Sequence, residues 1–393
     1  MVKKFICGDD AVAEGVRLAR PHVISAYPIT PQTVTVEKLS EFVEDGSLKA
    51  EYIHVESEHS ALACAIGVSS VGARAFTATS SQGLLYMAEN LPYASGARMP
   101  IVMMVANRSI ALPWSIYGDQ MDSMFLLNSG WIQVYVEDAQ EALDMTIQAY
   151  KIAETREVML PVMVNLDGFV LTHTYEVVEI PAQEMVDNFL PTIKMPDNSM
   201  SMEDPKSLCI SAGNTTNLEF RIKQQIDTEN SVSVIEKVDK EFGDMFGRYY
   251  GGMLEAYQCE DAEAVLVTTG SITGTSRIVL DQLRKEGKKV GLLKLRYLRP
   301  FPTAKLAEIL ENVKAVGVLD KSISFGYEGS IFTNVNSALL QSGIMPETVN
   351  FIGGLGGRDI TKQNIREMFE SLLASASGEK QQTLQYVNVR CKL

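Results

Sequence analysis

Four short loops of this chain carry polar side chains directly after apolar segments. They contain the Thr30 hydroxyl, the Glu58 carboxylate, the neighbouring Ser81 and Gln82, and the Arg108 guanidinium. A guanidinium can bind a carboxylate through two parallel hydrogen bonds. A carboxylate that is shielded from water can share a proton with a ring nitrogen. The set therefore suits an anionic carbonyl substrate held beside a protonatable ring.

Each of these residues also has an ordinary structural interpretation. Glu58 could compensate the positive end of a helix that begins near it. Arg108 could form a surface ion pair, and Thr30, which stands between Pro28 and Pro31, could serve turn chemistry. Spacing alone leaves both interpretations open for each residue.

The segments before these loops have the pattern of buried parallel strands. Short apolar strands alternate with segments of helical spacing, which is typical of a parallel sheet covered on both faces. Open sheets of this kind bind ligands at the carboxyl ends of their strands. We expect strands at 23–26, 51–55, 75–78, 101–105 and 161–165, and helices at 9–19, 33–42, 60–71, 82–94 and 139–152.

The alternating pattern breaks after residue 180, where prolines and polar residues indicate a linker over 181–204. A second α/β unit follows, with expected strands at 264–268, 290–295 and 315–319 and expected helices at 276–286, 303–312 and from Thr361. We expect a first domain over 1–180, a connecting segment over 181–255 and a second domain over 256–376. Residues 377–393 form a polar extension that we expect to wrap a partner.

Composition excludes several classes of function. The chain has 393 residues, 46% of them hydrophobic, and a net charge of −14 without a basic run, which argues against nucleic acid and anionic membranes as partners. No apolar run approaches the roughly 18 residues of a membrane span, and the N-terminus lacks a secretory pattern, so we expect a cytoplasmic protein. The five cysteines form no C-x-x-C, so neither a metal nor an iron–sulfur cluster is expected within this chain.

Several motifs, in order along the chain, resemble those of one family. They are AYPITPQ (26–32), VESEHSA (55–61), TATSSQG (77–83), GWIQ (130–133), RYLRPFP (296–302) and GGLGGRD (353–359). Together they resemble the alpha subunit of the 2-oxoacid:ferredoxin oxidoreductases. The resemblance implies an α/β fold, with a parallel-sheet domain for the pyrimidine side of thiamine diphosphate followed by a transketolase C-terminal-like domain.

The resemblance also implies roles for individual residues. Glu58 is expected to contact the aminopyrimidine ring of thiamine diphosphate, and Thr30 and Arg108 to receive the 2-oxoacid. These three are the expected catalytic residues. The expected cofactor-binding residues are Tyr27, Pro28, Ile29, Glu58, Ser81 and Gln82, and the expected substrate pocket consists of Thr30, Arg108 and Trp114.

Partner subunits are implied as well. In this family a beta subunit supplies a Gly-Asp-Gly motif for the diphosphate and Mg²⁺, and this chain contains no such motif. Gamma- and delta-type subunits bring [4Fe-4S] clusters and coenzyme A contacts, and ferredoxin is reached through them. The implied reaction is the oxidative decarboxylation of a 2-oxoacid to acyl-CoA and CO₂.

Pyruvate is the first expectation for the substrate. The segment PWSI (113–116) is more similar to the branched-chain members, so branched-chain and aryl 2-oxoacids, such as 2-oxoisovalerate and phenylglyoxylate, stay open. Trp114 could line the pocket or pack in a core. Two further interpretations are a transketolase-like carboligase and a non-catalytic scaffold subunit.

Overall fold

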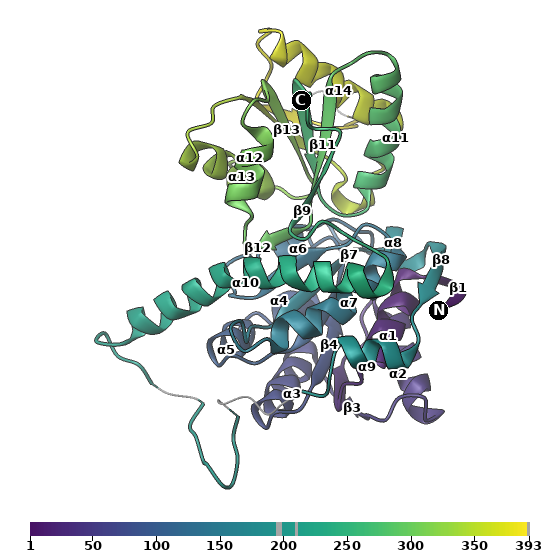
Figure 1. Cartoon of the computed structure of the whole chain (residues 1–393), viewed down its shortest axis with the longest axis vertical. Coiled ribbons are helices and arrows are strands. Elements are labelled where there is room, and N and C mark those ends of the chain that lie inside the picture. Colours follow the sequence, from purple (N-terminus) through teal and green to yellow (C-terminus); the bar gives the residue numbers. More distant parts are fainter. Residues whose placement is uncertain (194–198, 209–210, 391–393) are drawn as a thin grey trace.

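The computed structural model describes residues 1–193, 199–208 and 211–390, and two large sheets dominate it (Figure 1). Six strands of the first sheet are parallel, and the edge strand β12 pairs antiparallel with β6. The strand order is β12 (Tyr297–Arg299), β6 (Ile132–Tyr135), β7 (Val162–Asp167), β5 (Val102–Asn107), β4 (Ala75–Thr79), β2 (Val23–Ala26) and β3 (Glu51–His54).

Helices cover both faces of the first sheet because its central strands are apolar on both sides. Along β5, Val102 and Met104 belong to one buried cluster and Met103 and Val105 to another, as the two-residue period of a strand requires. The first cluster packs under α1 (Gly8–Ala19), α2 (Thr33–Glu44) and α7 (Ala139–Glu154), and the second under α3 (Glu58–Ser70), α4 (Ser81–Tyr86) and α5 (Leu91–Gly96).

The second sheet repeats this style of packing. Its strand order is β15 (Leu384–Tyr386), β14 (Glu347–Ile352), β13 (Ala315–Asp320), β10 (Ala264–Thr268), β11 (Val290–Leu295) and β9 (Leu254–Tyr257). All neighbouring strands are parallel except β9, which pairs antiparallel with β11. One face packs under α11 (Ile272–Lys285) and α14 (Lys362–Ala376), and the other under α12 (Thr303–Leu310) and α13 (Ser330–Gln341).

A long helix, α10 (Asn217–Phe246), runs between the two sheets in sequence and lies along the first unit (Figure 1). Phe242 and Phe246 in its C-terminal half pack against Phe189 of α9 (Gln183–Phe189). The smaller elements are β1 (Val2–Cys7) paired antiparallel with β8 (Tyr175–Ile180), α6 (Met121–Met124), α8 (Val170–His173) and a 3₁₀ turn at Leu355–Gly357. Among the helices in the described part of the chain, none has the length and hydropathy of a membrane-spanning segment.

Several expectations about elements were wrong. The helix expected at 82–94 is two short helices, because a turn closed by Asn90 N–H donating to the Met87 carbonyl (2.8 Å) separates α4 from α5. The linker expected over 181–204 contains α9, and its residues 194–198 lie outside the described part. The expected C-terminal extension contains β15, which adds a strand to the second sheet, and its expected contact with a partner stays a prediction.

Candidate active site

Arg108 connects three of the strand-end loops. It follows β5 directly and is 5% exposed. Its Nη1 donates to the Thr30 carbonyl (2.6 Å) and its Nη2 to Gln82 Oε1 (3.1 Å), so the loops after β2, β4 and β5 meet at one guanidinium. Because Arg108 forms no ion pair with any described residue, the surface ion-pair interpretation is wrong.

Glu58 stands in the first turn of α3 and is 8% exposed. Ser57 caps this helix by accepting a hydrogen bond from Ser60 N–H (3.2 Å). The Glu58 side chain lies against Gly83, where a Cβ would come within 2.5 Å of Glu58 Oε1 and 2.6 Å of Thr79 Oγ1. Glycine at position 83 therefore leaves the space that the Glu58 carboxylate uses.

The Glu58 carboxylate accepts no hydrogen bond and forms no ion pair among the described residues. Other buried polar atoms beside it also lack partners, namely Thr79 Oγ1, Gln82 Nε2 and Arg108 Nε. Buried polar groups are normally hydrogen-bonded, so a group of unpaired ones at a strand edge indicates a ligand site. A carboxylate acceptor beside amide and guanidinium donors fits the aminopyrimidine ring of thiamine diphosphate next to an anionic substrate.

Asp122 in α6 organises this edge, and the sequence did not single it out. Its carboxylate accepts hydrogen bonds from Ser81 N–H (3.0 Å), Arg108 N–H (3.0 Å), Asn107 Nδ2 (2.8 Å) and Ser123 N–H (2.8 Å). Burial raises the pKa of Asp122 to about 7, although these hydrogen bonds act in the opposite direction. Asp122 thereby fixes the backbone at Ser81 and Arg108. No local sequence motif predicts such a contact, because its partners are distant in the sequence.

The remaining expected cofactor-binding residues lie in or beside the strand-end loops, and those of the loop after β2 are partly exposed. Tyr27 is 38% exposed, Pro28 is exposed and Ile29 is half-buried, all in the loop after β2. The Ser81 hydroxyl donates to the Ser109 carbonyl (2.6 Å), so it stabilises the loop after β5. These positions leave the loop after β2 open to a partner or ligand.

Trp114 does not pack in a core, because it is 66% exposed. Its ring centroid lies 6.0 Å from Arg108 Cζ, within the range of a cation–π contact. The structure therefore brings Trp114 to the same edge as Arg108, at the solvent side.

The carboxyl edge of the second sheet faces this site. Asp167 at the end of β7 accepts hydrogen bonds from Lys321 Nζ (2.6 Å) and from Ser271 N–H (2.8 Å). Burial would raise the pKa of Asp167, but Lys321 and Ser271 outweigh it and lower the pKa. Gly356 N–H donates to Asp119 Oδ2 (2.9 Å), so the glycine-rich turn supports the loop that carries Trp114.

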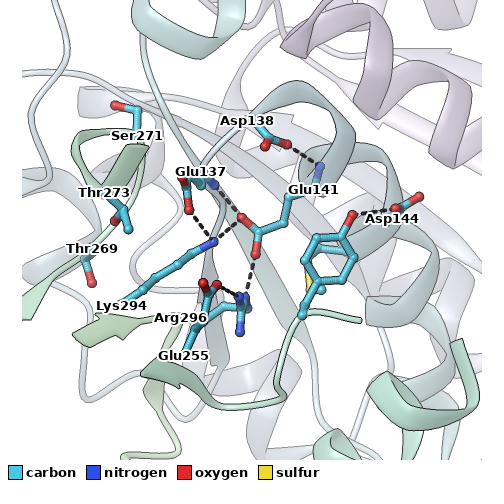
Figure 2. Close-up of polar contacts among 12 residues, drawn as sticks. Glu137, Asp138, Glu141, Asp144, Glu255, Thr269, Ser271, Thr273, Lys294 and Arg296 are labelled. Atoms are coloured by element: carbon cyan, nitrogen blue, oxygen red, sulfur yellow. Dashed lines mark hydrogen bonds and ion pairs between the residues drawn. The ribbon is translucent and has the colours of Figure 1, made fainter. Parts of the chain in front are cut away.

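A buried ion network joins the two units (Figure 2). Glu141 in α7 accepts from Lys294 Nζ (2.6 Å) and Arg296 Nε (2.5 Å), which lie at the end of β11 and just beyond it. Lys294 also pairs with Glu137 (2.9 Å), and Arg296 with Glu255 (3.5 Å). Burial alone would raise the pKa of Glu141, but the two cations outweigh it and lower the pKa to about 2.

Two mostly parallel sheets whose carboxyl edges lie close together, with polar side chains at these edges, define an α/β protein with a ligand site between its two units. Comparison with known families then identifies the group. Residues 14–240 match the thiamine-diphosphate-binding domain of the pyruvate flavodoxin/ferredoxin oxidoreductases, and residues 262–365 match core domain II of pyruvate:ferredoxin oxidoreductase. The chain belongs to the 2-oxoacid oxidoreductase family, as its motifs predicted.

Individual relatives cover nearly the whole chain. Pyruvate synthase subunit PorA of Methanothermobacter thermautotrophicus is 50% identical over 94% of both chains. Ketoisovalerate oxidoreductase subunit VorA of Pyrococcus horikoshii is 46% identical, again over 94% of both. Both relatives are named as subunits, so each of them belongs to an enzyme of several chains.

Solved structures support the fold. A 2-oxoglutarate:ferredoxin oxidoreductase from Magnetococcus marinus, solved with 2-oxoglutarate, coenzyme A and succinyl-CoA, superimposes with a TM-score of 0.72 at 22% identity. The match covers 94% of this chain but only 65% of that one. A split-gene transketolase, described as an inactive beta4 tetramer, gives a TM-score of 0.56 at 12% identity, over 95% of this chain and all of the other.

Proposed function

We propose that this chain is the alpha-type subunit of an enzyme that converts pyruvate, coenzyme A and two oxidised ferredoxins into acetyl-CoA, CO₂, two reduced ferredoxins and a proton. The observation that supports this most strongly is that Glu58, whose carboxylate has no hydrogen-bond partner among the described residues, and Arg108, whose buried Nε is unpaired, follow strands of the same sheet at its carboxyl edge. Bound thiamine diphosphate would supply the nucleophilic carbon and the electron sink for decarboxylation.

Glu58 is the proposed catalytic acid–base group. Its carboxylate would hold a proton at the aminopyrimidine nitrogen, and the absence of a side chain at Gly83 leaves the space in which this carboxylate lies. Tyr27, Pro28 and Ile29 would form the wall of the ring site. Gln82 would offer its unpaired Nε2 to the ring.

Arg108 is the proposed carboxylate-binding group. Its Nη1 and Nη2 are already held by Thr30 and Gln82, which fixes the guanidinium before substrate arrives. Nε donates to no described residue, so its N–H can bind a 2-oxoacid carboxylate. We propose that the Thr30 hydroxyl donates a hydrogen bond to the keto oxygen of the substrate. Trp114 would form the outer wall of the substrate pocket.

Other chains would complete the enzyme. We propose that a beta subunit binds the diphosphate and Mg²⁺, and that gamma- and delta-type subunits carry [4Fe-4S] clusters and contact coenzyme A. Within the described ranges no three His, Cys, Asp or Glu side chains gather as a metal site, which is compatible with this division. We propose a cytoplasmic complex in which ferredoxin docks on other subunits, because a net charge of −14 repels acidic proteins.

The experiment is a substrate panel on the complex purified through this chain. Coenzyme A-dependent reduction of a viologen dye is measured with pyruvate, 2-oxoisovalerate, 2-oxoglutarate and phenylglyoxylate. We expect pyruvate to give the highest kcat/KM. 2-Oxoisovalerate is the second candidate, because the exposed Trp114 belongs to the segment PWSI (113–116), which is more similar to the branched-chain members. A loaded complex that reduces the dye with none of these acids would refute the oxidoreductase and favour a carboligase or a scaffold.

A further inference from the structure

A cavity of about 420 Å³ lies in the first unit away from the strand-end site. It is bounded by α10, by the loop at 127–131 that leads into β6, and by Arg299 at the end of β12. Because β6 is parallel to β7, and β7 to β5, the loop before β6 lies at the amino edge of the sheet. The cavity is therefore on the opposite edge from Glu58, and the proposed reaction does not use it.

The lining of this cavity is basic and polar. It contains two guanidinium groups, from Arg221 and Arg299, and none of its lining residues is acidic. Two carboxylates of α10 lie near this lining in sequence. Glu219 stands two residues before Arg221 but does not line the cavity, and Asp227 is paired with both Arg98 and Lys223. In a chain of net charge −14, two arginines thus share a cavity without a counter-ion among its walls.

Arg299 is held in position but not neutralised. Its Nη1 donates to the Leu298 carbonyl (2.6 Å) and to Asn334 Oδ1 (3.1 Å). No described carboxylate forms an ion pair with Arg299 or with Arg221. Burial lowers the pKa of Arg299, which reflects the cost of desolvating a cation that lacks an anionic partner. A bound anion would recover part of that cost.

Neutral hydrogen-bonding groups complete the walls, including the side chains of Asn128, Ser129, Gln224 and Thr228. A volume of about 420 Å³ falls within the ordinary range of small-molecule sites. Arginine is the residue that binds phosphate oxygens through paired N–H donors. A phosphorylated small molecule therefore matches the cavity in charge, donor type and size.

We infer that this cavity binds the phosphate or diphosphate group of a small molecule between Arg221 and Arg299. The ligand would bridge the loop at 127–131, α10 and β12, which are far apart in the sequence. Strand β12 directly follows β11 of the second sheet in sequence but pairs with β6 of the first sheet. A ligand bound in the cavity would therefore strengthen the contact between the two units. Binding should accordingly raise the thermal unfolding temperature of the chain.

The test is calorimetric titration of the full-length chain with inorganic pyrophosphate, at an ionic strength matched with chloride. We expect saturable binding at one site and a loss of affinity of at least about tenfold in Arg221→Gln and in Arg299→Gln, since each removes charge-assisted hydrogen bonds. Lys223→Gln is the matched control, because it removes one charge from the same helix outside the lining. Its affinity should stay within about twofold of the native chain.

Two results would overturn the inference. One is the absence of saturable binding at millimolar pyrophosphate. The other is an affinity that Arg221→Gln leaves unchanged, because the pyrophosphate would then bind elsewhere. Arg221 is exposed on α10, so this variant should fold even if Arg299→Gln disturbs the contact of Arg299 with Asn334.

Discussion

Replacing Glu141 by Gln should loosen the junction between the two units. The carboxylate is fully buried between Lys294 and Arg296, and its pKa is lowered from 4.5 to about 2. At about 1.4 kcal/mol per pKa unit, this shift corresponds to roughly 3 kcal/mol of stabilisation by the ionised form. Glutamine keeps the shape of the side chain but mimics its protonated state, so Glu141→Gln should lose about 3 kcal/mol near neutral pH.

The assay is urea unfolding followed by two probes. Both tryptophans, Trp114 and Trp131, lie in the first unit, so their fluorescence reports that unit while far-ultraviolet circular dichroism reports the whole chain. We expect the two transitions to separate further in Glu141→Gln than in the native chain, because the second unit is released. Glu286→Gln, which breaks the exposed pair with Arg366, is the control and should change little.

The pH dependence follows from the same carboxylate. Because the folded-state pKa of Glu141 lies below its ordinary 4.5, ionisation stabilises the native chain above about pH 4.5, and that stabilisation disappears as the pH falls toward 2. The variant should lack this part of the acid dependence. Unfolding midpoints equal to those of the Glu286→Gln control at every pH would refute the reasoning.

Three further substitutions test how the strand-end site is built. Gly83→Ala would place a Cβ against the carboxylate of Glu58, so thiamine diphosphate should activate the assembled complex at a concentration at least about tenfold higher; an unchanged activation constant would contradict this packing. Asp122→Ala would leave the buried N–H groups of Ser81 and Arg108 unpaired, so the free energy of unfolding should fall by about 3 kcal/mol and kcat/KM should fall as well. A variant as stable as the native chain would contradict the role of Asp122 in holding these loops. Gly357→Ala adds a side chain at a φ of +76°, where it would collide with Tyr117. The KM for the 2-oxoacid should therefore rise severalfold while the affinity for the cofactor stays the same. An unchanged KM would show that this turn does not support the substrate pocket.

The local part of the fold was predictable from sequence. The apolar strands at 23–26, 75–78 and 264–268 were found because strands buried on both faces read as continuous apolar runs. Strand β12 was missed because it has three residues and pairs across the domain junction, and β15 because its pairing partner lies about thirty residues earlier. Short edge strands depend on tertiary contacts that leave little periodicity in the chain.

The same distinction applies to the site. Glu58, Thr30 and Arg108 follow expected parallel strands, so they were expected at one edge of the sheet, and the family resemblance gave them their expected roles. Asp122 was not predicted, because its role comes from accepting backbone N–H groups of loops 14 and 41 residues away. The Glu141 network was likewise invisible, since its partners follow more than 150 residues later in the sequence.

The most direct test of the central proposal is Glu58→Gln in the assembled complex. Coenzyme A-dependent viologen reduction with the preferred 2-oxoacid should fall by at least about 100-fold, because the proposed proton-holding group is lost. Assembly with the partner subunits should be unchanged by size-exclusion chromatography. Glu56→Gln, two residues earlier and exposed, is the matched control and should retain activity. A Glu58→Gln complex that turns over at the native rate would contradict the assignment of this strand edge as the active site.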